Sequence, residues 1–384
     1  MPYEKAEEDS SPHKNGYAIL PQQSLSRIVF IATKILFLEA KSTNWDANVW
    51  FLERFSIPEE RMNPSNLIES FNFRPVKNKE NRKLLKLYMK NQLGVGSFAI
   101  SNIQSQFHKV RRFAIFCDEK GMSFLSMKEE GVKEYIDFLE ERDILAATFN
   151  KEILAVHQFF AFLKLKGFVK EIPFSLELYL KNEIPVHHNR SVSKEHVDTI
   201  LNNLFQMPLH LRLMFLHLWA LGLRSNEVCT IRAGAYKKKE DTYWLTLYQY
   251  KMHTEKSIPI PGILYEIMVR YIQKKELKPG EYVFQNKRGG AYQTQTFREQ
   301  MKEWVHTFGM DDYLFKSHDY RHTFVTALWE ANIPLPVIRD YVGHKDDDMT
   351  MQYLDYREEQ VKKESEAYFL LPGKSLAARV DEDG

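Results

Sequence analysis

Between residues 84 and 181, apolar side chains recur three and four positions apart, the spacing that places them on one face of a helix. Glycine follows two of these stretches, at Gly121 and Gly167, where a left-handed backbone can end a helix. Ser126 and Glu129 have the spacing of a capping box. We therefore expect a compact helical bundle. The apolar stretches span residues 97–117, 127–139 and 147–166.

The second half of the chain mixes helical and strand patterns. A very apolar stretch, 209–221, ends at Gly222, as a buried helix would. Two alternating runs, 242–250 and 256–261, predict a β-hairpin in which Pro259 restricts the second run to a sheet edge. The expected fold class is therefore α+β, mainly α with a small antiparallel hairpin or sheet. Further helices are expected at residues 24–40, 196–204, 264–277, 295–308, 322–332 and 335–341.

These patterns divide the chain into three parts. Residues 1–82 are expected to form a tail and an aromatic-rich extension of unassigned role. Residues 83–184 are expected to form the helical domain, and residues 185–384 the mixed domain with a C-terminal segment. Weak periodicity over 182–190 predicts a linker between these two domains.

Composition excludes several classes of protein. Two cysteines, Cys117 and Cys229, lie far apart in 384 residues, so we expect neither a disulfide framework nor a cysteine zinc cluster. The longest apolar stretch, 28–38, contains Lys34 and is shorter than the roughly 20 residues that a membrane span needs. The first residues are acidic and polar, unlike a secretory signal. We therefore expect a cytoplasmic protein without a membrane partner.

Charge is nearly balanced, with 53 basic and 51 acidic residues and a formal net charge of +2. Binding to a polyanion would therefore depend on local clusters rather than on a global field. For any one cluster taken alone, a solvated face of a helix or strand is the more common explanation. The candidate clusters are Lys109, Arg111 and Arg112; Arg232 with Lys237, Lys238 and Lys239; and Lys274, Lys275 and Lys278.

Arg224 follows the end of the apolar stretch 209–221, in the sequence LGLRSNE. A guanidinium is always charged and offers a planar fork that suits a phosphate. The alternative is a helix-terminal salt bridge with Glu227. Both interpretations stay open at this point.

His318 and Arg321 lie three residues apart, so a helix would place an acid–base group beside a phosphate-binding group. His318 and His322 are four apart and could supply half of a zinc site. However, a zincin has Glu directly after the first His, where this chain has Asp319 and then Tyr320, and no third ligand follows at a standard spacing. We therefore expect no metal.

His344 follows a glycine, and Tyr353 comes nine residues later. Ionising a free tyrosine at pH 7 costs roughly 4 kcal/mol, so a nucleophilic tyrosine needs nearby cations and a base. Tyr356 lies three residues further on and shares much of the same helical face, which makes it the rival nucleophile.

Taken in order, these residues resemble the tyrosine recombinase family, also called phage integrases. Members show Arg in a GLR-x-x-E motif, a hairpin Lys eight residues before a strand proline, H-x-x-R, and then G-H followed by Tyr. Here Lys251 precedes Pro259 by eight residues. The resemblance covers residues 190–357, and the bundle at 84–181 is similar in layout to the family's core-binding domain. The N-terminal extension is somewhat similar to that of transposon-encoded recombinases.

The resemblance implies site-specific cleavage and rejoining of DNA strands through a 3′-phosphotyrosyl intermediate, without metal or nucleotide cofactor. The implied roles are attack by Tyr353 and clamping of the phosphate oxygens by Arg224 and Arg321. The implied assisting residues are Lys251 as proton donor to the leaving oxygen, His318 as proton acceptor, His344 as a phosphate hydrogen-bond donor, and Glu227 as the residue that orients His318 or Arg224.

The resemblance also implies double-stranded DNA as a partner, four protomers in the synaptic complex, accessory recombination factors, and a place at the bacterial nucleoid. Lys109, Arg111 and Arg112 are the candidates for DNA backbone contacts. The segment 361–371 would dock on a neighbouring protomer or on its own chain. Two alternatives stay open: relaxation of DNA as in type IB topoisomerases, and a non-catalytic DNA-binding module.

Three features depart from the family pattern. Tyr320 replaces the leucine of H-x-L-R, and Val342 replaces the leucine before Gly-His, both of which we interpret as packing changes. Residues 346–348 are three aspartates, Asp346, Asp347 and Asp348, in place of a mostly Ser-rich turn. They would put negative charge near DNA or contact another subunit.

Overall fold

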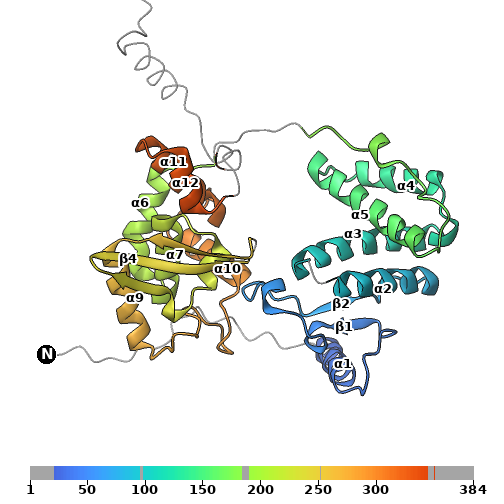
Figure 1. The fold of residues 1–384 in the computed structure, drawn as a ribbon, viewed down its shortest axis with the longest axis horizontal. Helices are drawn as coiled ribbons and strands as arrows, with labels where there is room; N and C mark the ends of the chain where they lie inside the picture. The colour runs from blue at the N-terminus through green and yellow to red at the C-terminus, as the bar shows by residue number, and fades with distance from the viewer. Residues whose placement is uncertain (1–20, 96–97, 184–189, 251, 345–349, 351–384) are drawn as a thin grey trace, which may run out of the picture. The chain divides into compact units, whose positions relative to one another are not determined.

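The computed structural model forms two compact units, shown in Figure 1. One unit contains residues up to 57 and residues 68–181, and the other contains residues 58–67 and the chain from 182 onward. The first unit is helical with a two-stranded sheet, and the second combines helices with a three-stranded sheet. The predicted α+β class is confirmed. The structure describes residues 21–95, 98–183, 190–250, 252–344 and 350.

The helical bundle of the first unit is built as its periodicity predicts. The apolar stripe of the second helix, from Ile103 to Cys117, is buried. Aromatic rings fill the centre, where Phe113 contacts Phe124 and Tyr135 with ring centroids 5.6 and 4.9 Å apart. The helices are α2 (Lys79–Gly94), α3 (Ile100–Glu119), α4 (Glu129–Glu140) and α5 (Ala146–Leu165).

The predicted ends of these helices are correct, but one predicted start is wrong. Gly121 and Gly167 have φ angles of +67° and +76° after α3 and α5. Ser126, however, ends a short 3₁₀ helix (Phe124–Ser126), and α4 begins at Glu129 without a side-chain cap. The capping box therefore does not form, because Ser126 still belongs to the preceding turn.

The aromatic-rich extension packs on the bundle. Strands β1 (Val49–Phe51) and β2 (Ser70–Asn72) pair antiparallel, with Trp50 opposite Phe71. The Phe71 ring lies 5.1 Å from that of Phe107 on α3, so these aromatic residues continue the core of the bundle. The boundary expected near residue 82 thus falls inside this unit. The extension begins with helix α1 (Pro21–Leu38), and no helix of the described residues is both long and apolar enough to cross a membrane.

Residues 58–67, here called the 58–67 segment, belong to the second unit and meet the start of helix α10 (Thr294–Thr307). The Thr294 amide donates to the Ser65 carbonyl oxygen at 2.9 Å, and the Thr294 hydroxyl to Ser65 Oγ at 3.0 Å. The Gln293 side chain donates to the Pro64 carbonyl oxygen at 3.0 Å. The first amides of a helix lack partners within it, so the segment caps α10 from outside.

Replacing Ser65 with alanine should therefore loosen the start of α10. The buried Ser65 side chain also donates to Asn63 Oδ1 at 2.8 Å, so the change breaks two hydrogen bonds. We expect a loss of about 1–2 kcal/mol in the protection of the Thr294 amide against hydrogen exchange. Ser101→Ala, an exposed position on α3, is the matched control and should leave that protection unchanged. Equal protection in both variants would show that the segment does not stabilise α10.

The second unit contains the predicted hairpin. Its three-stranded antiparallel sheet has the order β3-β4-β5, so Pro259 lies on an edge strand, as predicted. Strand β3 was not predicted, because its sequence, YKKK, shows no alternation of apolar and polar residues. The strands are β3 (Tyr236–Lys239), β4 (Thr242–Gln249) and β5 (Thr254–Pro259); the remaining helices are α6 (Lys194–Asn203), α7 (Leu209–Leu221), α8 (Ser225–Cys229), α9 (Gly262–Lys274), α11 (Ser317–Glu330) and α12 (Leu335–Val342).

Candidate active site

Several of the predicted site residues meet within the second unit. Arg224 and Glu227 come from the start of α8, His318 and Arg321 from α11, and His344 follows α12. Other predicted residues lie outside the described part of the chain: Lys251, Asp346, Asp347, Asp348, Tyr353, Tyr356 and the segment 361–371.

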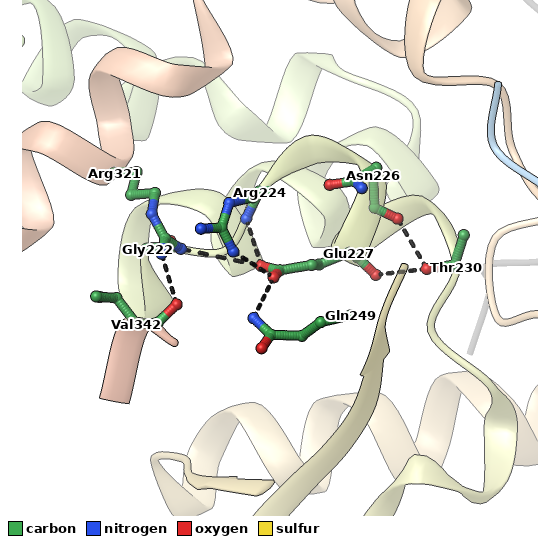
Figure 2. A network of polar contacts seen from close by, with 8 residues as sticks. All are labelled: Gly222, Arg224, Asn226, Glu227, Thr230, Gln249, Arg321 and Val342. Carbon is green, nitrogen blue, oxygen red and sulfur yellow. Dashed lines mark hydrogen bonds and ion pairs between the residues drawn. The ribbon is translucent and has the colours of Figure 1, made fainter. Parts of the chain in front are cut away.

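Arg321 is the most enclosed residue of this cluster, with none of its side chain exposed. Its two terminal nitrogens donate to the carbonyl oxygens of Gly222, at 2.9 Å, and Val342, at 2.5 Å (Figure 2). These carbonyls end helices α7 and α12, where the aligned peptide dipoles leave partial negative charge. Two helix ends therefore hold the guanidinium in one orientation.

Both helices end in a left-handed glycine. Gly222 and Gly343 have φ angles of +57° and +68°. A Cβ at Gly222 would lie 2.4 Å from the Phe324 ring, and one at Gly343 would lie 2.7 Å from the Gln249 side chain. The left-handed backbone favours glycine at both positions, and at Gly222 the Phe324 ring also leaves no space for a side chain. The ends of α7 and α12 can then close tightly around Arg321.

Glu227 links the two arginines (Figure 2). Its carboxylate accepts hydrogen bonds from the Arg224 amide at 2.8 Å and from Arg224 Nη1 at 2.9 Å. Arg321 Nη1 lies 3.9 Å away, and Gln249 Nε2 donates to the carboxylate at 2.8 Å. The salt bridge between Arg224 and Glu227 therefore exists, and the same carboxylate caps α8 through the Arg224 amide. It also aligns Arg224 beside Arg321, so the two interpretations of Arg224 are compatible.

The Glu227 carboxylate is ionised. Its burial alone would raise its pKa, but the cations Lys256, Arg321 and Arg224 and the backbone hydrogen bond from Arg224 lower the pKa to about 2. At neutral pH this carboxylate carries a full negative charge between positive groups.

The two histidines of the site are neutral at pH 7. Desolvation, followed by the charges of Arg321 and Arg224, lowers the pKa of His344 to about 3. Desolvation and the neighbouring His322 ring lower the pKa of His318 to about 4. His344 is buried, and its Nδ1 lies 3.0 Å from the Thr350 hydroxyl. A neutral imidazole can accept a proton or donate one N–H bond, which suits both predicted roles.

The two departures from the family pattern that fall on described residues are packing changes. The Tyr320 ring is buried against Phe215 and Phe315, with centroids 5.1 and 5.4 Å apart. Its hydroxyl accepts a hydrogen bond from Tyr313 at 3.1 Å. Val342 is fully buried, and its carbonyl is one of those that hold Arg321.

Lys256, on β5, is a member of the cluster that motif spacing did not identify. Only 8% of the residue is exposed, and its ammonium lies 5.8 Å from the centre of the Tyr341 ring. A signal was available in the alternation along the strand, since Lys256 lies two residues before the buried Ile258 and shares its face.

The predicted DNA-binding cluster lies in the first unit, and its side chains already have partners. Arg112 pairs with the buried Glu152. Arg111 donates to the Asn72 carbonyl oxygen at 2.9 Å, and Lys109 bonds to Ser105 on its own helix. All three side chains are half-buried, which leaves part of each accessible.

A groove of about 1120 Å³ opens beside His318. Its walls come from residues 190–193, from the first turn of α6, from α10 and from residues 313–319. Four cations line it, against the acidic Glu299 and Asp319; the cations are Arg190, Arg298, Lys302 and Lys316. Within the described ranges, no group of three or more His, Cys, Asp or Glu side chains is arranged to bind a metal ion.

Comparison with known proteins agrees with this arrangement. Residues 190–360 match the phage integrase family. Transposase B from transposon Tn554 of Staphylococcus aureus is 25% identical over 331 residues, 83% of this chain and 52% of the transposase. The chain thus spans about half the length of that relative. Tyrosine recombinase XerC of Bacillus pumilus is 24% identical over 70% of this chain and 90% of its own.

Solved structures share the fold. The XerH site-specific recombinase bound to its difH substrate has a TM-score of 0.55 and 14% identity, covering 76% of this chain and 89% of XerH. A lambda integrase dimer bound to a core site has a TM-score of 0.53 and 17% identity, covering 71% of this chain and 76% of the integrase.

Proposed function

We propose that the protein cleaves and rejoins DNA at specific sites through a 3′-phosphotyrosyl intermediate, because residues 190–360 match the phage integrase family. The observation that carries the proposal is the pair of arginines joined by the ionised Glu227. Two fixed guanidinium groups suit the non-bridging oxygens of a phosphodiester, whose charge grows in the transition state.

The reaction needs a nucleophile, a base and an acid around that phosphate. We assign attack to the Tyr353 oxygen, with the neutral His318 taking its proton. Lys251 would protonate the departing 5′-oxygen, and His344 would donate a hydrogen bond to a phosphate oxygen. The new phosphotyrosine bond retains the energy of the phosphodiester, so a free 5′-hydroxyl can reverse the step without a nucleotide cofactor.

Both units would bind DNA through contacts to its phosphates. The basic groove beside His318 supplies four cations for phosphates on the catalytic side. Among the described residues, the Lys109 ammonium is hydrogen-bonded to Ser105, on the preceding turn of its own helix, so it can turn toward DNA without breaking a contact to another element. Arg111 and Arg112 would contribute through the accessible parts of their side chains.

The biological process that we propose is the movement of a mobile element. The relative Transposase B from Tn554 supports transposition, and XerC supports site-specific recombination between two duplexes. Recombining two duplexes requires four protomers, one for each cleaved strand. Segment 361–371 would join neighbours in that ring, and accessory factors would select the sites.

The test is covalent trapping on a nicked duplex library drawn from sequences that border the gene. A nick beside the cleavage point lets the short product leave, so the protein stays attached. Attachment and strand exchange between two sites would support the proposal. Attachment with DNA relaxation alone would identify a type IB topoisomerase, and binding without attachment would identify a DNA-binding module.

Lys251→Ala should slow cleavage by about 10²- to 10⁴-fold, because the leaving oxygen loses its proton donor. A substrate with a bridging 5′-phosphorothiolate should restore most of the rate, since its leaving thiolate needs no proton. The measurement is single-turnover cleavage of the two substrates side by side. If sulfur substitution gave no rescue, Lys251 would hold DNA rather than donate a proton.

A further inference from the structure

The ammonium of Lys256 is buried and interacts electrostatically with Glu227, Arg321 and Arg224. Its Nζ is inaccessible to solvent and has no hydrogen-bond partner among the described residues. A lysine in this position needs a compensating charge, because burial of an unpaired ammonium is costly. The anion that raises its pKa is Glu227, whose carboxylate also pairs with Arg224 and lies 3.9 Å from Arg321.

The groups around Lys256 can be counted element by element. The charges of Glu227 and Arg224 on α8, and of Arg321 on α11, act on its pKa. The Tyr341 ring lies beside it on α12, and the neutral His344 follows that helix. Without Lys256, two arginines and one carboxylate leave a charge of +1. With protonated Lys256 the described site reaches +2.

The difference between a site charge of +1 and one of +2 affects how strongly the site binds the transition state of phosphoryl transfer. A phosphodiester carries one negative charge, and the pentacoordinate transition state carries nearly two. Positive charge beside the phosphate therefore binds the transition state more strongly than the ground state. Protonated Lys256 adds one such charge to the described cluster, and differential binding of this kind accelerates a reaction.

Resting on the function proposed above, we propose that Lys256 is a positioning residue that offsets the charge of Glu227 and so leaves both arginine charges available to the scissile phosphate. Glu227 can then align Arg224 and Arg321 without cancelling either of them. Lys256 acts through Glu227 from the buried face of β5, and it differs in this from Lys251, which we assign to proton transfer.

The protonation of Lys256 agrees with this role. Desolvation, partly offset by Glu227, lowers its pKa to about 7. A bound phosphate adds negative charge and raises that pKa, so Lys256 should take up a proton when DNA binds at pH 8. His318 and His344 have pKa values of about 4 and 3, well below pH 8, so these histidines stay neutral when DNA binds.

The experiment compares Lys256→Met and Lys256→Arg with wild type in the full-length protein. We expect Lys256→Met to slow single-turnover cleavage by about 10- to 100-fold, the effect of one unit charge several ångströms away in a protein interior. Lys256→Arg should recover most of the rate. Lys287→Met, at an exposed position, is the matched control and should cleave normally. Methionine removes a buried charge, so the melting temperature of Lys256→Met should not fall.

Two further readouts separate charge balance from other roles. The defect of Lys256→Met should persist on the 5′-phosphorothiolate substrate, because the missing charge acts on the phosphate and not on the leaving group. Calorimetry in buffers of different ionisation enthalpy should show proton uptake on DNA binding at pH 8 in Tyr353→Phe, and its loss when Lys256→Met is added.

Each contrary result has one meaning. Normal cleavage by Lys256→Met, with wild type forming its adduct, would overturn the role of Lys256 and leave the proposed function standing. Rescue by sulfur would make Lys256 the leaving-group acid and would also overturn the inference. Absence of any adduct with wild type would overturn the proposed function itself.

Discussion

Tyr353→Phe should form no covalent adduct with DNA, while its affinity for the target site stays within a few-fold of wild type. The substitution removes the oxygen that we propose as the nucleophile and keeps the ring. The measurement is trapping on the nicked substrate followed by denaturing electrophoresis, with a mobility-shift assay to compare binding.

Tyr356→Phe is the matched control and should trap DNA as wild type does. An adduct mapped by mass spectrometry to Tyr356 would move the nucleophile by three residues. Tyr341 is a poor competitor, because burial raises its pKa and its hydroxyl donates to the Pro259 carbonyl oxygen at 3.3 Å.

Arg321→Lys should reduce the rate of cleavage by about 10²- to 10³-fold, the usual effect of losing one fixed donor to a developing charge. Lysine keeps the charge but lacks the planar fork that reaches both the Gly222 and Val342 carbonyls. One of these buried carbonyls would lose its partner, so the free energy of unfolding should also fall by about 1–3 kcal/mol.

Single-turnover cleavage and thermal melting measure the two effects of Arg321→Lys separately. Arg270→Lys, whose side chain is 79% exposed on α9, is the matched control for the same chemical change. A wild-type rate in Arg321→Lys would mean that charge alone suffices and that the two helix ends do not orient the group for catalysis.

Local signals in the sequence predicted much of the second unit. Gly222 marked the end of α7 because left-handed backbone favours glycine, and alternation with Pro259 marked the hairpin and its edge strand. The order of Arg224 and H-x-x-R identified residues that the fold then brings together around Glu227.

Other features depend on contacts that sequence spacing does not contain. Ser126 is a residue type that often caps a helix, but it is the last residue of the preceding 3₁₀ helix and so does not cap α4. The environment of Lys256 on β5 includes Glu227 and Tyr341, which are distant from it in the sequence. Spacing along the strand alone could not predict these neighbours. The docking of Ser65 on Thr294 joins positions 229 residues apart and has no local signature.

The 58–67 segment also limits how chimeras of this protein and its relatives can be built. The chain passes from one unit to the other at three places, after residues 57, 67 and 181. A chimera joined at the linker would take residues 182–384 without the segment that caps α10, leaving the Thr294 amide without its partner. The second unit is therefore not one contiguous segment of the chain, and it can be exchanged intact only together with residues 58–67 of the N-terminal extension.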